Sequence, residues 1–209
     1  MVVAGGSGAR FGGHKQFAPL GGRQVVEWSL DVARTVCEGV VLVVPDTWLA
    51  ACSGRADAVV AGGVTRAGSV RAGLERVPAG ADVVIVHDAA RPLASRELWR
   101  TVIDAVVAGA DAAVPCVPVT DTIKQRQADG SLVTLERSRL VASQTPQAFC
   151  HEALRRAHAG GGEATDDAAL LESLGCRVVE VPGEPANFKL TGPSDLRVAE
   201  LLLGAERCS

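Results

Sequence analysis

The chain has 209 residues, 47% of them hydrophobic and 22% charged, and its formal net charge is −3. This is the balance of a globular protein that can bury a sizeable core, and it excludes a disordered chain. The charge and the low aromatic content of 3% give no reason to expect a nucleic acid partner. We expect one domain over residues 1–209.

Neither a membrane span nor a secretory signal is expected. No uninterrupted apolar run approaches the roughly 18 residues of a transmembrane helix, and the N-terminus leads directly into a strand. The six cysteines follow no CxxC or Cys/His ligand spacing, which favours free thiols over a disulfide framework or a zinc site. We therefore expect a cytoplasmic protein.

The stretch from Val2 to Phe17 combines the end of a buried strand, a glycine-rich loop and two cations. Its glycines leave backbone N–H groups open to a polyanion; they are Gly5, Gly6 and Gly8. Arg10 and Lys15 bring positive charge to the same place. We interpret the stretch as a phosphate cradle, which the N-terminus of a helix near Gln24 would also face.

Two better-known glycine motifs do not fit this loop. The dinucleotide fingerprint, started at Gly6, meets Phe11 where it needs a glycine, and the P-loop, started at Gly8, meets His14 after its second glycine. A tight turn whose glycines only serve the backbone remains the alternative. The chain uses three lysines against 18 arginines, so Lys15 is an unusual choice, and a flexible point charge suits a phosphoryl group whose charge moves.

Strands and helices alternate along the next hundred residues. Continuous apolar runs at Gly39–Pro45, Ala58–Ala61, Asp82–Asp88 and Ala112–Pro115 predict strands. Helical spacing predicts helices over Val25–Ala33, Thr65–Val77 and Ser95–Ala108. The pattern indicates an α/β fold, with a mostly parallel twisted sheet and helices on both faces.

Three loops follow strands at the carboxyl edge of this sheet, where ligands bind in such folds. They are the N-terminal glycine loop, Ala61–Val70 and His87–Pro92. We expect them to converge on one crevice.

The alternation of strands and helices stops over Val117–Ser143, where a polar alternating pattern is broken at Ala128-Asp129-Gly130. This predicts a β-hairpin arm without helix. Because an arm with two unpaired edges normally needs a partner, we favour a homodimer contact over a flap that folds back. Helices over His151–Ala159, Asp166–Leu174 and Pro193–Leu203 and a strand over Arg177–Val181 are expected to complete the fold.

The chain carries, in order, GGSGAR, Lys15, HDAARP, TDTIK, TPQAF, ATDD and NFKLTGPSD. With these motifs it resembles the 2-C-methyl-D-erythritol 4-phosphate cytidylyltransferase family over Val2 to about Leu203. The resemblance implies a Rossmann-like nucleotidyltransferase fold, a β-hairpin dimerisation arm, Mg²⁺ as cofactor, and joining of CTP to a sugar-alcohol phosphate in non-mevalonate isoprenoid synthesis.

The resemblance also implies roles for single residues. The nucleotide would be bound by Ala4, Gly5, Gly6, Gly8, Gly63, Ser69, Asp88 and Ala89. The catalytic cations would be Arg10, Lys15, Arg137 and Lys189, with Arg137 supplied by the other subunit. The sugar phosphate would be bound by Asp88, Arg91, Thr122, Arg137, Thr145 and Lys189. The metal would be held by Asp88.

Some positions depart from the family pattern. An acidic residue of the family is Val64 here, and a proline is His14. From the residues alone, Asp88 could instead have a helix-capping or loop role, and Arg91 and Arg137 could be solvated surface residues. We interpret the four histidines as structural or exposed, and the pair Asp166 and Asp167 as helix caps.

Three other functions remain alternatives. A ribitol 5-phosphate cytidylyltransferase would share most of these motifs. An NAD-dependent oxidoreductase is disfavoured by the broken fingerprint. A non-catalytic nucleotide-binding protein would bind CTP without turnover.

Overall fold

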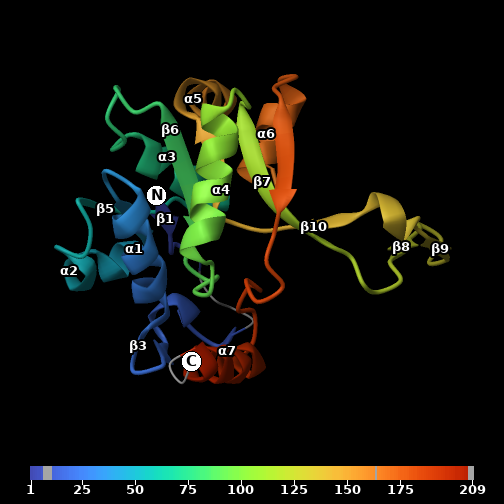
Figure 1. Cartoon of the computed structure of the whole chain (residues 1–209), viewed down its shortest axis with the longest axis horizontal. Helices are drawn as coiled ribbons and strands as arrows, with labels where there is room; N and C mark the ends of the chain where they lie inside the picture. The colour runs from blue at the N-terminus through green and yellow to red at the C-terminus, as the bar shows by residue number, and fades with distance from the viewer. Residues whose placement is uncertain (7–10, 163, 207–209) are drawn as a thin grey trace.

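A computed structural model describes residues 1–6, 11–162 and 164–206. Eight strands form its main sheet (Figure 1). Seven of them follow the order β10-β7-β11-β6-β1-β4-β5, and the eighth, β12, lies outside this order and pairs with β7. Their bounds are β1 Val2–Val3, β4 Val41–Val44, β5 Ala58–Ala61, β6 Val83–Asp88, β7 Ala112–Pro118, β10 Val141–Ser143, β11 Gln147–Cys150 and β12 Val178–Pro182. The sheet is largely parallel, as predicted, but β10 and β11 run antiparallel to their neighbours.

Helices cover both faces of the sheet (Figure 1). One face carries α1 (Val25–Val36), α2 (Leu49–Cys52) and α4 (Arg96–Val107), and the other carries α3 (Arg66–Leu74), α5 (His151–Ala159) and α6 (Asp167–Ser173). Along β4, Leu42 and Val44 belong to the first core, and Val41 and Val43 to the second. Since strand side chains alternate between faces, a continuously apolar strand fills both cores.

Local signals account for where several helices begin. The hydroxyls of Thr65 and Ser95 each accept a hydrogen bond from a backbone N–H three residues on, at 3.0 Å, and so cap α3 and α4. The last helix, α7 (Pro193–Glu206), packs beside the sheet against Leu20 and Leu190. No helix in the described ranges is long and apolar enough to cross a membrane.

The prediction for the chain after the arm missed a central strand. β11 lies between β6 and β7, with Ala148 paired to both Ile85 and Ala113. Its four residues run directly into α5, so the apolar pattern of the strand merges with that of the helix. The short hairpin of β2 (Pro19–Leu20) and β3 (Arg23–Gln24) and the 3₁₀ helices η2 (Lys15–Phe17) and η3 (Asp46–Trp48) were also not predicted.

The predicted hairpin is present and projects from the body of the molecule (Figure 1). β8 (Lys124–Arg126) pairs with β9 (Leu132–Thr134), and Gly130, with φ +85°, makes the turn where the pattern breaks. The prediction of an arm without helix was wrong, because a 3₁₀ helix, η4 (Arg137–Arg139), precedes β10. Every residue of β8 and β9 is exposed.

Candidate functional site

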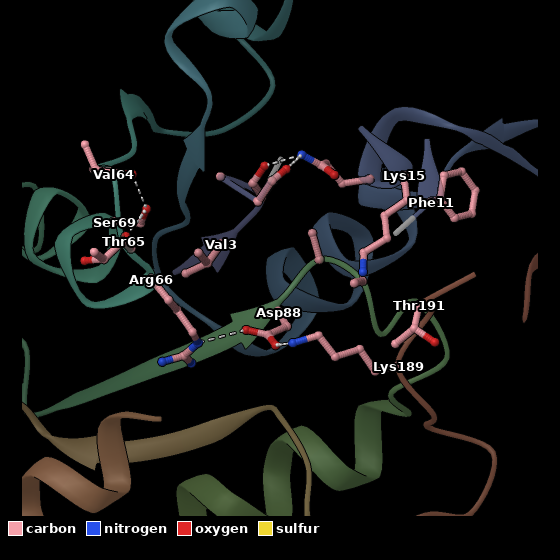
Figure 2. A pocket seen from close by; sticks show the side chains of 17 residues that line it. Val3, Phe11, Lys15, Val64, Thr65, Arg66, Ser69, Asp88, Lys189 and Thr191 are labelled. Carbon is pink, nitrogen blue, oxygen red and sulfur yellow. Dashed lines mark hydrogen bonds and ion pairs between the residues drawn. The ribbon is translucent and has the colours of Figure 1, made fainter. Parts of the chain in front are cut away.

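A cavity of about 500 Å³ lies at the carboxyl ends of β1, β5 and β6 (Figure 2). The three loops expected to converge all contribute to its lining. Its lining includes nine residues singled out from the sequence: Ala4, Gly5, Gly6, Lys15, Gly63, Ser69, Asp88, Ala89 and Lys189. Two others, Gly8 and Arg10, lie outside the described residues.

Two of the cavity glycines lie where the loops pack closely. A Cβ atom on Gly5 would lie 3.0 Å from Oγ of Ser69, and one on Gly63 would lie 2.7 Å from the backbone carbon of Gly68. Among the described residues, a Cβ on Gly6 would meet nothing within 4 Å. The backbone explanation therefore applies to Gly5 and Gly63, whereas Gly6 borders open space.

Gln16 holds the first glycine loop in place. Its Nε2 donates hydrogen bonds to the carbonyl oxygens of Ala4 at 2.6 Å and Gly6 at 3.0 Å. Lys15 precedes it in η2 and lines the cavity. No residue of α1 lines the described part of the cavity, and Glu27 accepts from the backbone N–H of Gln24 at 2.8 Å. Because residues 7–10 lie outside the described residues, the expectation that the helix N-terminus near Gln24 faces the loop stays a prediction.

Asp88 ends β6 and carries the carboxylate of the cavity. Lys189 Nζ lies 2.5 Å from its Oδ2, and Arg66 Nε lies 3.4 Å from its Oδ1 (Figure 2). Burial acts to raise the pKa of Asp88, but these two cations outweigh it and lower the pKa below its usual range. The carboxylate is therefore ionised at neutral pH and caps no helix.

Thr145 contacts both Asp88 and the neighbouring His87. The Thr145 hydroxyl accepts from the backbone N–H of Asp88 at 3.0 Å and lies 3.3 Å from Nδ1 of His87. His87 is fully buried, and burial lowers its pKa to about 3. Nε2 lies 3.1 Å from the carbonyl oxygen of Arg91, which can only accept, so Nε2 carries the proton and Thr145 donates to Nδ1. Thr145, expected to bind substrate, does not line the cavity.

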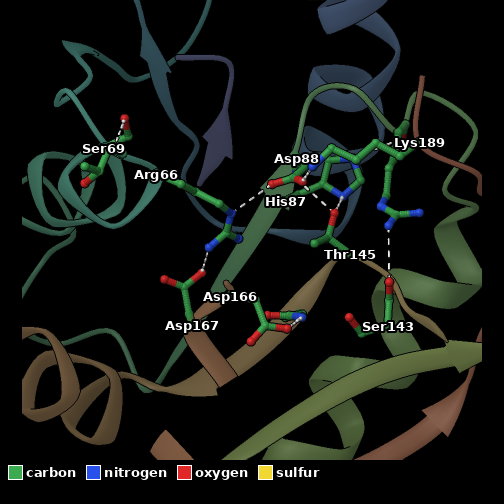
Figure 3. A network of polar contacts seen from close by, with 12 residues as sticks. Arg66, Ser69, His87, Asp88, Ser143, Thr145, Asp166, Asp167 and Lys189 are labelled. Carbon is green, nitrogen blue, oxygen red and sulfur yellow. Dashed lines mark hydrogen bonds and ion pairs between the residues drawn. The ribbon is translucent and has the colours of Figure 1, made fainter. Parts of the chain in front are cut away.

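Sequence reasoning missed the ion-pair network behind Asp88 (Figure 3). Nη1 of Arg66 lies 2.7 Å from Oδ2 of Asp167, and Nε2 of His158 lies 2.9 Å from Oδ1 of the same carboxylate. The helix-cap interpretation is confirmed for Asp166, which accepts from the N–H of Ala169, but it was wrong for Asp167. The available signal was an arginine inside the loop Ala61–Val70, a loop expected at the crevice.

The other predicted sugar-phosphate residues lie apart from the cavity. The guanidinium of Arg91 donates to the carbonyl oxygens of Asn187 at 2.8 Å and Ser143 at 3.2 Å. Arg137 and Thr122 are exposed residues of the arm, and Arg137 donates to the carbonyl oxygen of Thr120. None of the three lines the cavity of its own chain.

The donor set of the cavity fits a magnesium ion that is brought in with phosphates. No group of three or more His, Cys, Asp or Glu side chains that could hold a metal occurs among the described residues. Asp88 is the one carboxylate that lines the described part of the cavity. Because Mg²⁺ commonly takes one or two carboxylates and completes its shell with phosphate oxygens and water, a single ionised aspartate suffices.

Comparison with known proteins agrees with this arrangement. A family model described as 2-C-methyl-D-erythritol 4-phosphate cytidylyltransferase matches residues 1–205. A protein of that name from Nocardia farcinica is 41% identical over 213 residues, which cover 97% of this chain and 92% of that protein. A bifunctional IspD/IspF enzyme of Clavibacter michiganensis is 44% identical over 99% of this chain, which spans only 54% of that relative's length.

The fold agrees as well. The crystal structure of 2-C-methyl-D-erythritol 4-phosphate cytidylyltransferase from Thermus thermophilus superposes with a TM-score of 0.85 at 35% identity, covering 97% of each chain. The chain belongs to the 2-C-methyl-D-erythritol 4-phosphate cytidylyltransferase family.

Proposed function

We propose that the chain transfers a cytidylyl group from CTP to 2-C-methyl-D-erythritol 4-phosphate and releases pyrophosphate, a step of non-mevalonate isoprenoid synthesis. The observation that carries the proposal is the meeting of two glycine loops, two lysines and one ionised carboxylate in a single cavity. Membership of the family supplies the identity of both substrates.

In this reaction a phosphate oxygen of the sugar phosphate attacks the α-phosphorus of CTP in line. The bond from the α-phosphorus to the bridging oxygen breaks, and pyrophosphate leaves with the electron pair. Such transfers depend on positioning and charge stabilisation, so no protein nucleophile is needed. The Ser69 hydroxyl is accordingly engaged with the backbone, 3.0 Å from the carbonyl oxygen of Thr65.

Each part of the cavity then has a task. The loops around Gly6 and Gly63 would bind the nucleotide, and Ser69 would keep them apart at a fixed distance. Lys15 and Lys189 would stabilise the negative charge that develops on the phosphates. Asp88 would hold Mg²⁺, which when bound neutralises phosphate charge.

We also propose that two copies of the chain complete each site. Arg137 and Thr122 lie on the exposed arm and do not line the cavity of their own chain. A partner's arm could bring the same residues to this cavity, because a two-fold pair exchanges identical elements. In this proposal residues 1–209 act as one nucleotidyltransferase domain, with 117–143 as its dimerisation arm.

The test is pyrophosphate release with CTP and MgCl₂ against a panel of sugar-alcohol phosphates. We expect 2-C-methyl-D-erythritol 4-phosphate to be the fastest acceptor and CTP to be preferred over ATP, GTP and UTP. An Asp88→Asn variant serves as the inactive control. Faster turnover of ribitol 5-phosphate would assign the chain to that acceptor instead, and CTP binding without turnover of any acceptor would make it a non-catalytic nucleotide-binding protein.

A further inference from the structure

Asp88 has two cationic partners of different character. Lys189 is bound through a flexible stem, and 41% of its side chain is exposed. Arg66 is the less exposed of the two, at 25%, and approaches the other oxygen of the carboxylate. A lysine can leave for a phosphate group at little steric cost, whereas a planar guanidinium held at two points cannot.

The buried carboxylate of Asp167 holds the guanidinium of Arg66. Asp167 is 1% exposed and binds Nη1 of Arg66 at 2.7 Å (Figure 3). Its second oxygen binds His158, which is 3% exposed. The first residue of α3 is thereby connected to α6 and α5. The contact with Asp167 holds Arg66 independently of Lys189.

Catalysis as proposed above requires Lys189 and Asp88 to separate. Lys189 would turn to the phosphates, and the oxygen that it leaves, Oδ2, would become available to the metal. Without a second restraint the Asp88 carboxylate could rotate and follow Lys189. Arg66 Nε, on Oδ1, supplies that restraint.

We propose that Arg66 is a positioning residue, which Asp167 anchors, and that it keeps the Asp88 carboxylate directed into the cavity when Lys189 turns to the phosphates. The inference rests on the proposed function for the role of the metal. Groups that orient a metal ligand typically change metal affinity or activity by about 10- to 100-fold when they are removed.

Two variants that change the local charge in opposite directions distinguish a positioning role of Arg66 from a purely electrostatic one. Arg66→Gln removes a positive charge near Asp88, and Asp167→Asn removes a negative charge behind Arg66. If Arg66 acted only as a charge, the first variant would favour Mg²⁺ binding and the second would disfavour it. If Arg66 positions Asp88, both variants weaken Mg²⁺ binding.

The measurement is calorimetric titration of CTP at a series of MgCl₂ concentrations, without acceptor, together with kcat and KM for both substrates. We expect each variant to raise the Mg²⁺ concentration for half-maximal CTP binding and to lower kcat by about tenfold or more. The double variant should be no worse than Arg66→Gln, since the anchor acts only through Arg66. The matched control is Arg71→Gln, which removes a positive charge from the same helix at a residue that does not line the cavity.

Thermal unfolding of every variant completes the test. Shifts of the Mg²⁺ midpoint in opposite directions would overturn positioning in favour of a charge effect. If Tm falls while kcat and the Mg²⁺ concentration for half-maximal CTP binding stay unchanged, the contacts of Arg66 serve stability alone, and the positioning role is overturned. If both midpoints rise as expected but no acceptor is turned over, the positioning role stands and the proposed reaction fails.

Discussion

Lys189 and Asp88, 101 residues apart in the chain, both line the cavity and form an ion pair, with Nζ 2.5 Å from Oδ2. In the ligand-free chain each of these charges neutralises the other. Because each charge has a partner, both can remain ionised although they are partly buried, until a ligand with its own charges separates them.

Replacing Lys189 tests this pair. We expect Lys189→Met to lower kcat by about 100-fold, because one cation aimed at developing phosphate charge is typically worth roughly 3 kcal/mol. CTP affinity should fall much less, since the loss acts on the transition state. Single-turnover kinetics on the variant, with the exposed Arg100→Ala as a charge control, give the answer. An unchanged chemical step would remove Lys189 from catalysis.

The buried His87 predicts a loss of stability in mild acid. Its pKa in the fold is about 3, below the ordinary value of 6.5, because burial disfavours its charged form. The unfolded chain therefore takes up the proton first as the pH falls, and the fold loses stability from pH 6.5 downward. Between pH 7 and pH 5 this one group accounts for about 2 kcal/mol of unfolding free energy.

Denaturant unfolding of the wild type and a His87→Asn variant at both pH values measures this contribution. Although the variant should be less stable at pH 7, its free energy of unfolding should change less between the two values. Equal changes in the two proteins would show that His87 does not carry the acid sensitivity.

The second glycine loop should not tolerate a side chain. Gly63→Ala would place a Cβ 2.7 Å from the backbone carbon of Gly68, and backbone can yield only by moving the loop. We expect a stability loss of about 1–3 kcal/mol and weaker CTP binding. Gly80→Ala is the control, since a Cβ there meets nothing within 4 Å. Unchanged CTP affinity in Gly63→Ala would mean that this loop does not touch the nucleotide.

The arm predicts complementation between two inactive proteins. Arg137→Ala and Lys15→Ala are each expected to be inactive, but in a mixed dimer with shared sites one site carries both changes and the other carries neither. Full random exchange of equal amounts should restore about a quarter of wild-type activity by counting sites in a two-fold pair. No recovery after proven subunit exchange would place Arg137 in the site of its own subunit.

Interactions between close neighbours in the chain were predictable from the sequence. The caps at Thr65 and Ser95 and the hairpin turn at Gly130 each depend on a few consecutive residues, so short windows contain the whole signal. The apolar strands and the family motifs likewise placed the glycine loops, Lys15 and Asp88 at one edge of the sheet.

Contacts between residues far apart in the chain were decided only by the tertiary structure. Arg66 and Asp167 are 101 residues apart, and their pairing depends on how α3 and α6 pack on one face of the sheet. Arg91 lies three residues beyond Asp88 yet turns to the carbonyls of Asn187 and Ser143. A guanidinium binds whichever acceptors packing brings within reach, and the sequence by itself does not specify those distances.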